Sequence, residues 1–170
     1  MNSNIIEMNK QARLSQHFTL GELCKTSVKT ADGNIPSRVN IENLKRVCSW
    51  LERLRQKWNE RYGSLTPNPS PKGEGNSDDP IVINSGYRSE AVNKAVGGAK
   101  GSNHLTGCAV DIRCAGIEQA LRYATTLLDI SDESGEDFDE LLIEKSAKSI
   151  WVHFAVRPEG NRMKIRFIQT

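Results

Sequence analysis

Three side chains that commonly bind metal ions stand in two short, otherwise apolar segments of this 170-residue chain. His104 and Asp111 lie in one segment with six residues between them, and His153 follows about forty residues later. Two imidazoles and one carboxylate would leave the fourth position of a tetrahedral zinc ion open for water, as catalytic zinc sites require. A lone histidine in an apolar strand is more often a hydrogen-bonded core residue, so the surrounding sequence must decide.

The local pattern suggests how these side chains could converge. Gly107 allows the chain to turn from a loop into an alternating segment at 108–113, so His104 and Asp111 can approach from adjoining elements. Residues 150–156 also alternate and read as a strand, in which His153 shares a face with Trp151 and Ala155. The remaining histidine, His17, lies beside Phe18 at a helix entrance, and we assign it no catalytic role.

The other elements follow from hydrophobic periodicity and capping residues. We expect helices at 19–23, capped by Thr19 with Glu22 as its capping-box partner, and at 40–62, 89–96 and 117–130. Strands are expected at 81–84, 108–113, 138–145, 150–156 and 163–168, with a hairpin around 146–149. The buried stripe of the last helix is expected to comprise Ala120, Leu121, Ala124, Leu127 and Leu128. This order predicts an α+β fold with an antiparallel sheet and flanking helices.

One domain is expected from the length and composition. Residues 1–15 are predicted to be a flexible N-terminus, and 16–170 a single domain. The segment 65–80 is rich in Pro, Gly and charge and reads as a surface loop. A domain boundary there would leave two halves that are each small for an independent core.

Composition excludes several classes of protein. A net charge of +2 argues against nucleic acid or an anionic membrane as the main partner, and no apolar stretch is long enough to span a membrane. The N-terminus has no basic start and no apolar core, so we expect no secretory signal. The four cysteines form no C-x-x-C pair, which argues against a structural zinc knuckle and favours buried, reduced thiols.

Motifs in four segments resemble those of the M15 family of zinc peptidases. They are S-x-H-x-x-G-x-A-x-D over 102–111, W-V-H over 151–153, S-G-Y-R-S over 85–89 and the opening H-F-T-x-x-E-L over 17–23. The family includes D-alanyl-D-alanine carboxypeptidases and phage endolysins, and shares its fold with the hedgehog signalling domain. The resemblance covers roughly residues 16–157.

The resemblance implies a role for each matching residue. His104, Asp111 and His153 would bind one zinc ion. Arg88 would hold a peptide carboxylate or the developing oxyanion, since a guanidinium suits both. Ser102 would help to anchor the substrate. A surface salt bridge is the alternative reading for Arg88.

The chain departs from the family pattern at the general base. In several M15 enzymes an acidic residue lies three positions before the last histidine, but that position is Ile150 here. Glu144 is the best replacement, because two possible hairpin registers put it on the face of His153. If residue 147 pairs with 150, Glu144 lies opposite His153; if residue 145 pairs with 150, Glu144 lies opposite Trp151 on the same face. A register changed by one residue would turn Glu144 towards solvent beside Lys145. Asp139 and Glu140 are weaker candidates.

We therefore expect a monomeric zinc metallopeptidase that cleaves peptidoglycan stem peptides, as a carboxypeptidase or an endolysin. It would be encoded by a bacterium or a phage, made in the cytoplasm and active on the cell wall. The alternative is a catalytically inactive module that binds zinc or peptidoglycan, which Ile150 favours. A metal-free structural protein would leave the coupled motifs unexplained.

Overall fold

A computed structural model describes residues 9–62 and 81–169 of the chain. The expected surface loop at 65–80 lies outside the described residues. The helices are α1 (Leu20–Leu23), α2 (Arg38–Tyr62), α3 (Glu90–Ala95) and α4 (Ile117–Ser134), with a 3-10 turn, η1, at Asn103–Thr106. The strands are β1 (Ile83–Ser85), β2 (Ala109–Cys114), β3 (Glu140–Lys145), β4 (Ile150–Ala155) and β5 (Lys164–Gln169).

The strands form one sheet in the order β1-β2-β4-β3-β5. This arrangement confirms the predicted α+β class, but the sheet is mixed, because β5 pairs with β3 in parallel. Strand β4 ends at Ala155, beside the start of β3 at Glu140. Residues 156–163 then lead to the other edge of β3, where β5 begins with Lys164 paired to Glu140. The expectation of a purely antiparallel sheet is wrong at this one strand pair.

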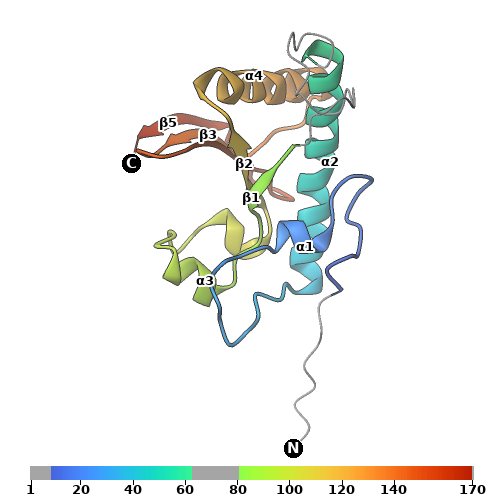
Figure 1. Ribbon diagram of the computed structural model, residues 1–170. Helices are drawn as coiled ribbons and strands as arrows, with labels where there is room; N and C mark the ends of the chain where they lie inside the picture. Colours follow the sequence, from blue (N-terminus) through green and yellow to red (C-terminus); the bar gives the residue numbers. More distant parts are fainter. Residues whose placement is uncertain (1–8, 63–80, 170) are drawn as a thin grey trace, which may run out of the picture.

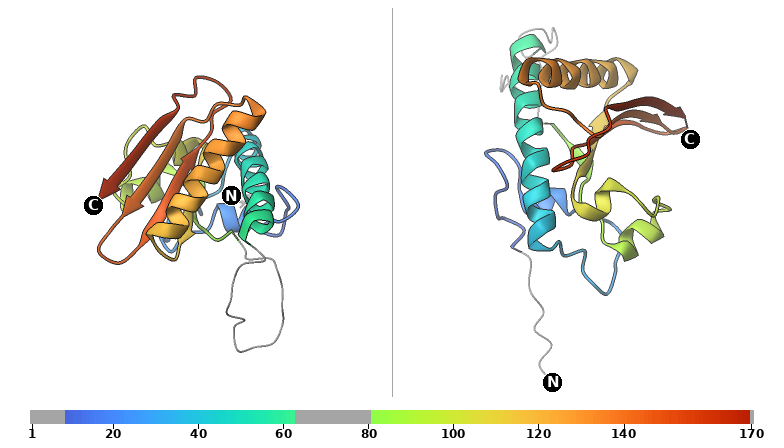
Figure 2. Two further views of the ribbon diagram at one scale, coloured as in Figure 1. Left: turned by 90° about the horizontal axis from the view of Figure 1, so that it is seen from above. Right: turned by 180° about the vertical axis from the view of Figure 1, so that it is seen from behind.

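The core lies between one face of the sheet and the helices α2 and α4 (Figures 1 and 2). The ring centroids of Trp50 on α2 and Phe154 on β4 are 5.1 Å apart. The strand residues that share this face are buried and apolar; they are Val110, Ile112, Leu141, Ile143, Val152 and Phe154. Alternation then directs Asp111 and His153 to the opposite face.

Helix α4 differs from its prediction in length and in its buried face. It continues four residues beyond the expected end at residue 130 to Ser134, and Gly135 then ends it in a left-handed conformation at φ +67°. Leu121 is 50% exposed, so its place in the buried stripe was wrong; Tyr123 and Ile130 are buried instead. Leu121 follows buried Ala120 by one residue, which turns it about 100° around the helix and out of the packed face.

The segment just before α1 contacts the rest of the domain. Thr19 and Glu22 form the predicted capping box. Ala12 and Leu14 pack against the core, and the Ser15 hydroxyl donates to a Glu52 carboxylate oxygen at 2.6 Å. These residues fall in the stretch assigned above to a flexible N-terminus. Their contacts tie the chain to α2 from residue 12 onwards.

Two expectations drawn from composition have structural counterparts. The four cysteines are buried and unpaired, as expected for reduced thiols. Among the helices of the described segments, none combines the length and apolarity needed to cross a bilayer.

Candidate metal centre

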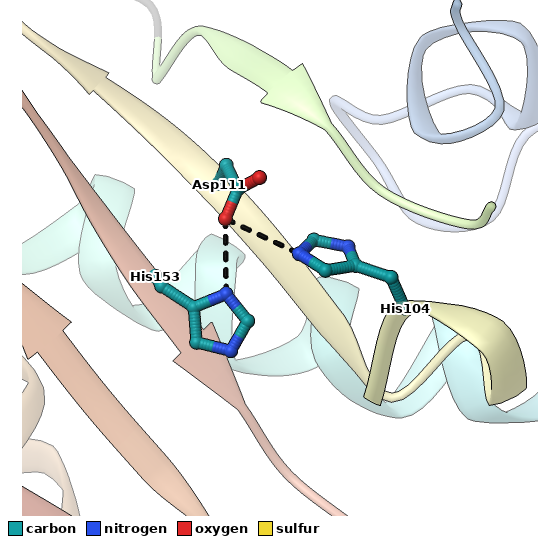
Figure 3. A group of neighbouring side chains, drawn as sticks. All are labelled: His104, Asp111 and His153. Carbon is teal, nitrogen blue, oxygen red and sulfur yellow. Dashed lines mark hydrogen bonds and ion pairs between the residues drawn. The ribbon is translucent and has the colours of Figure 1, made fainter. Parts of the chain in front are cut away.

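His104, Asp111 and His153 meet on the sheet face opposite α2 and α4 (Figure 3). Asp111 on β2 and His153 on β4 are direct cross-strand partners, and His104 comes from η1. Asp111 Oδ1 lies 2.9 Å from His153 Nδ1 and 3.2 Å from His104 Nε2. All three residues are buried, and their ligand atoms lie within 4.8 Å of one another.

The backbone at Gly86 orients the His104 ring. His104 Nδ1 lies 2.6 Å from the Gly86 carbonyl oxygen, which can only accept a hydrogen bond, so Nδ1 carries the proton. In the neutral ring, Nε2 is then a lone pair that faces another acceptor, Asp111 Oδ1. A cation between these two atoms would satisfy both, and this favours a metal site over a hydrogen-bonded core histidine.

Close packing explains the glycines that flank the site. A Cβ at Gly86 would lie 2.2 Å from the Leu23 carbonyl oxygen. Gly107 adopts φ +72° between η1 and β2, and a Cβ there would lie 2.6 Å from the Asn40 carbonyl oxygen. Glycine at 107 therefore permits the turn that carries the chain from His104 into the strand of Asp111.

The charges at the site suit a divalent cation. Burial by itself would raise the pKa of Asp111, but the two histidines outweigh it and hold that pKa well below its usual range. Burial likewise opposes the charged form of His153, yet hydrogen bonds to Asp111 and Glu140 raise its pKa to about 9. Without a metal, a proton on His153 helps to balance this buried carboxylate. A bound divalent cation would take the place of that proton, and two nitrogen donors with one oxygen donor match zinc.

Arg88 holds the second oxygen of the aspartate. Its Nη2 donates to Asp111 Oδ2 at 2.5 Å, and its Nε donates to the Ser85 hydroxyl at 2.8 Å. The ion pair predicted as the alternative reading therefore exists, but its partner is a candidate metal ligand rather than a surface acid. Within the described residues, Nη1 has no hydrogen-bond partner.

A cavity of about 550 Å³ opens over the three candidate ligands. One wall comes from the loop at 96–104, and the floor comes from β2, β3 and β4. Arg88, Ser102 and Glu144 all line it. The Ser102 hydroxyl also caps η1 by accepting a hydrogen bond from the His104 backbone at 3.3 Å.

The hairpin register brings Glu144 into this cavity. Lys145 pairs with Ile150, the second of the two registers considered, and Glu144 pairs with Trp151 on the His153 face. Burial raises the pKa of the Glu144 carboxyl above its usual value, against the opposing effect of His153. Ile150 belongs to the hydrophobic core. Since residues three apart in a strand point to opposite faces, an acid at position 150 would not reach the cavity.

The two weaker candidates for the base are engaged elsewhere. Asp139 is fully buried, and both of its oxygens accept hydrogen bonds from Arg162 at 2.7 Å. Glu140 lines the cavity but is paired with Lys164 at 2.8 Å and faces His153 Nε2 at 3.4 Å.

Sequence reasoning gave no role to Asn103, which contacts both of these carboxylates from the position next to His104. No spacing marked it, because its partners lie more than thirty residues away in sequence. Sequence reasoning named Glu140 only as a weaker candidate for the base, although alternation along β3 puts it on the same face as Glu144.

Comparison with known proteins agrees with this geometry. Residues 72–152 match the family model described as Peptidase M15. The matched segment contains two of the candidate metal ligands, His104 and Asp111. It also contains Arg88 and Glu144, and it ends one residue before His153. No curated protein matches the chain.

Proposed function

We propose that the chain is a zinc-dependent peptidase that cleaves the stem peptides of peptidoglycan, because residues 72–152 match the family model described as Peptidase M15. The observation that carries the proposal is the buried His104–Asp111–His153 cluster on the floor of a cavity that also holds Glu144. A cluster with only a structural role in the core would not explain the adjoining cavity. Nor would it explain why Arg88 Nη1 has no hydrogen-bond partner among the described residues.

Each of the three ligand residues would contribute one atom: His104 Nε2, Asp111 Oδ1 and His153 Nδ1. When bound there, zinc would polarise the scissile carbonyl and lower the pKa of the attacking water. The chain itself supplies the alignment of these atoms. Gly86 fixes the His104 ring, and Arg88 holds the free oxygen of Asp111, which leaves Oδ1 directed at both histidines.

Glu144 is the proposed general base. Its carboxylate would take a proton from the attacking water as the oxygen adds to the carbonyl carbon. The same proton would then pass to the leaving nitrogen as the C–N bond breaks. Partial burial raises its pKa, which makes the carboxylate a stronger base than an exposed glutamate.

Arg88 and Ser102 would hold the substrate. Arg88 Nη1 can donate to a peptide carboxylate or to the developing oxyanion while Nη2 stays on Asp111. The Ser102 hydroxyl already accepts from the His104 backbone, and its own proton can donate to a substrate carbonyl.

The substrate class follows from the family resemblance and is part of the proposal. The target would be a carboxypeptidase substrate ending in D-Ala-D-Ala or a bond that an endolysin cuts, in the wall of a bacterial cell. We propose that the enzyme acts as a monomer with one zinc ion.

Metal analysis combined with a digestion assay tests the function. The purified protein is expected to contain one zinc ion per chain and to release new amino groups from purified peptidoglycan. Chelation should abolish the release, and added zinc should restore it. Mass spectrometry of the products identifies the bond, since a carboxypeptidase liberates single alanines and an endolysin liberates larger fragments.

The second candidate is an inactive module that binds zinc or peptidoglycan, because the chain departs from the M15 pattern at Ile150 and its proposed base, Glu144, comes from a different strand. A protein that binds zinc and sediments with peptidoglycan, but releases no amino groups from any wall preparation, would favour that module. A protein without metal affinity would contradict both candidates.

A further inference from the structure

Polar side chains at the start of β3 connect the two elements that carry the histidine ligands. Asp139 and Glu140 lie beside Asn103, which directly precedes His104, and Glu140 also faces His153 on β4. We call Asn103, Asp139, Glu140, Arg162 and Lys164 the β3 carboxylate cluster. None of these residues is required by the function proposed above.

Both oxygens of Glu140 have partners within the cluster and at the site. Oε1 accepts from Lys164 Nζ at 2.8 Å and lies 3.0 Å from Arg162 Nη2. Oε2 accepts from Asn103 Nδ2 at 3.1 Å and lies 3.4 Å from His153 Nε2. The carboxylate is therefore held from three sides, with its remaining contact directed at the candidate metal ligand.

Asp139 supports Glu140 from the interior. Its carboxylate has no exposed surface and accepts from Arg162 Nε and Nη2 at 2.7 Å each. Asn103 Nδ2 also donates to Asp139, at 2.7 Å. The same amide and the same guanidinium thus contact both carboxylates, and this limits the positions that Glu140 can take.

The two nitrogens of the His153 ring face different groups. Nδ1 is directed at Asp111 Oδ1, and Nε2 is directed at Glu140 Oε2. A neutral imidazole has one donor and one acceptor nitrogen, and the group opposite one nitrogen decides which tautomer forms. Without a metal, Asp111 is the nearer acceptor, since its Oδ1 lies 2.9 Å from Nδ1. With a cation between Nδ1 and Asp111, Nδ1 must carry a lone pair, and the carboxylate opposite Nε2 then accepts the one remaining ring proton.

We propose that Glu140 is a positioning residue for His153, which fixes the ring tautomer so that Nδ1 is the nitrogen available to the metal. This inference rests on the metal site of the proposed function. A carboxylate that accepts the second ring N–H also increases the basicity of the ligand, and loss of such a partner typically weakens metal binding about 10- to 100-fold. Through Asn103, the same carboxylate also holds the turn that carries His104.

The competing explanation is that Glu140 only anchors β5 by its ion pair with Lys164. Replacing Lys164 by Met removes that ion pair and leaves the contact with His153, which makes Lys164→Met the matched control. Glu140→Ala removes both contacts. Glu140→Gln keeps an oxygen that can accept from Nε2 but loses the charge.

Zinc affinity, measured by competition with a chromophoric chelator, separates these explanations. Glu140→Ala is expected to bind zinc about 10- to 100-fold more weakly than the wild type, and Glu140→Gln to recover part of that loss. Lys164→Met is expected to bind within about threefold of the wild type. Circular dichroism should verify that every variant compared is folded. If Glu140→Ala misfolds, the Glu140→Gln and Lys164→Met pair still tests the proposal.

The proton on His153 Nε2 gives a readout that a purely structural role would not move. In proton–nitrogen spectra of the zinc-loaded wild type, this proton should resonate far downfield and exchange slowly, because Glu140 accepts it. Glu140→Ala should lose that signal, and Lys164→Met should keep it. Unchanged zinc affinity in folded Glu140→Ala, or an equal loss in Lys164→Met, would overturn the proposal.

The proposed function and this inference can fail separately. A wild type that binds zinc with the expected dependence on Glu140, yet cleaves no peptide, supports the inference and contradicts the peptidase. An active peptidase whose zinc affinity does not respond to Glu140 contradicts only the inference. A wild type without zinc affinity overturns both.

Discussion

Glu144 and Trp151 are direct cross-strand partners in the β3–β4 hairpin, and their pairing puts the Glu144 carboxylate on the sheet face that carries His153. Burial raises the pKa of the Glu144 carboxyl, and the neighbouring His153 and Trp151 side chains partly oppose this rise. The glutamate therefore lies in the cavity with a fixed neighbour, and its contribution can be tested by substitution.

Glu144→Gln should lower kcat/KM by about 100- to 10,000-fold, because the amide cannot accept the proton of the attacking water. Zinc content should stay at the wild-type value, since Glu144 is not among the three candidate ligands. Product release from stem peptides, followed by chromatography, measures the rate. Glu118→Gln, on the surface of α4, is the control and should behave as wild type. Activity untouched by Glu144→Gln would refute the assigned base.

Ile150→Glu should destabilise the fold without adding activity, because its side chain belongs to the core. A buried, unpaired carboxylate costs several kcal/mol, whereas Ile150→Val should cost about 1 kcal/mol. Urea unfolding monitored by tryptophan fluorescence measures both. A well-folded Ile150→Glu enzyme with increased activity would show that position 150 reaches the cavity after all.

Gly107→Ala should lower both stability and zinc content. The backbone has φ +72°, which costs an alanine about 1 kcal/mol, and the added Cβ would press on the Asn40 carbonyl oxygen. Relief of that contact would displace His104 from Asp111. Gly101→Ala is the matched control in the cavity wall, since a Cβ there meets nothing within 4 Å. The melting temperature and the amount of bound zinc should fall in Gly107→Ala and stay at the wild-type values in Gly101→Ala.

Asp139→Asn should remove part of the acid sensitivity of folding. Burial alone would raise the pKa of Asp139, but hydrogen bonds from Arg162 and Asn103 hold it below its usual value. A lowered native pKa contributes stability that is present above the unfolded pKa of about 3.9 and is lost as pH falls through the native pKa.

Unfolding free energies of Asp139→Asn should therefore be about 3 kcal/mol lower than wild type at pH 7, and the difference should shrink below about pH 4. Urea titrations from pH 7 to pH 2 measure this. Asp137→Asn, an exposed neighbour, should follow the wild type throughout. A constant difference at all pH values would contradict the role of the Asp139 charge.

The cysteines should not react in the native protein. Burial raises the pKa of Cys24 and of Cys48 to about 12, and that of Cys114 to about 11, so their thiolates are scarce at pH 8. A thiol-specific reagent should modify all four cysteines in denaturant, and none within the same time without it. Fast modification of the native protein, or loss of activity without reductant, would contradict buried, unpaired thiols.

Periodicity was a reliable guide where one face of an element is buried along its length. Helix α2 was predicted within two residues of its start, because its apolar side chains recur at the helical period over seven turns. Leu121 shows the limit of that guide. A helix carries more apolar residues than its packed face can cover, and only the neighbouring elements decide which of them are exposed.

The chemistry of the site was present in the chain, in the two histidines, the aspartate and the turns at Gly86 and Gly107. Strand alternation placed His153 on one face with Trp151 and Ala155 before any contact was known. These features are local, since each depends on residue types a few positions apart.

Contacts between distant segments decided the rest. The hairpin register directs Glu144 into the cavity, and a shift of one residue would have turned it away. The parallel pairing of β5 with β3 brings Lys164 and Arg162 to Glu140, and the antiparallel pairing of β3 with β4 brings Glu140 to His153. The sequence by itself determined which ligands and which strand face were available. The tertiary structure decided which carboxylate lines the open cavity and which faces a candidate ligand, because Glu140, Glu144 and His153 come together only when β3 and β4 pair.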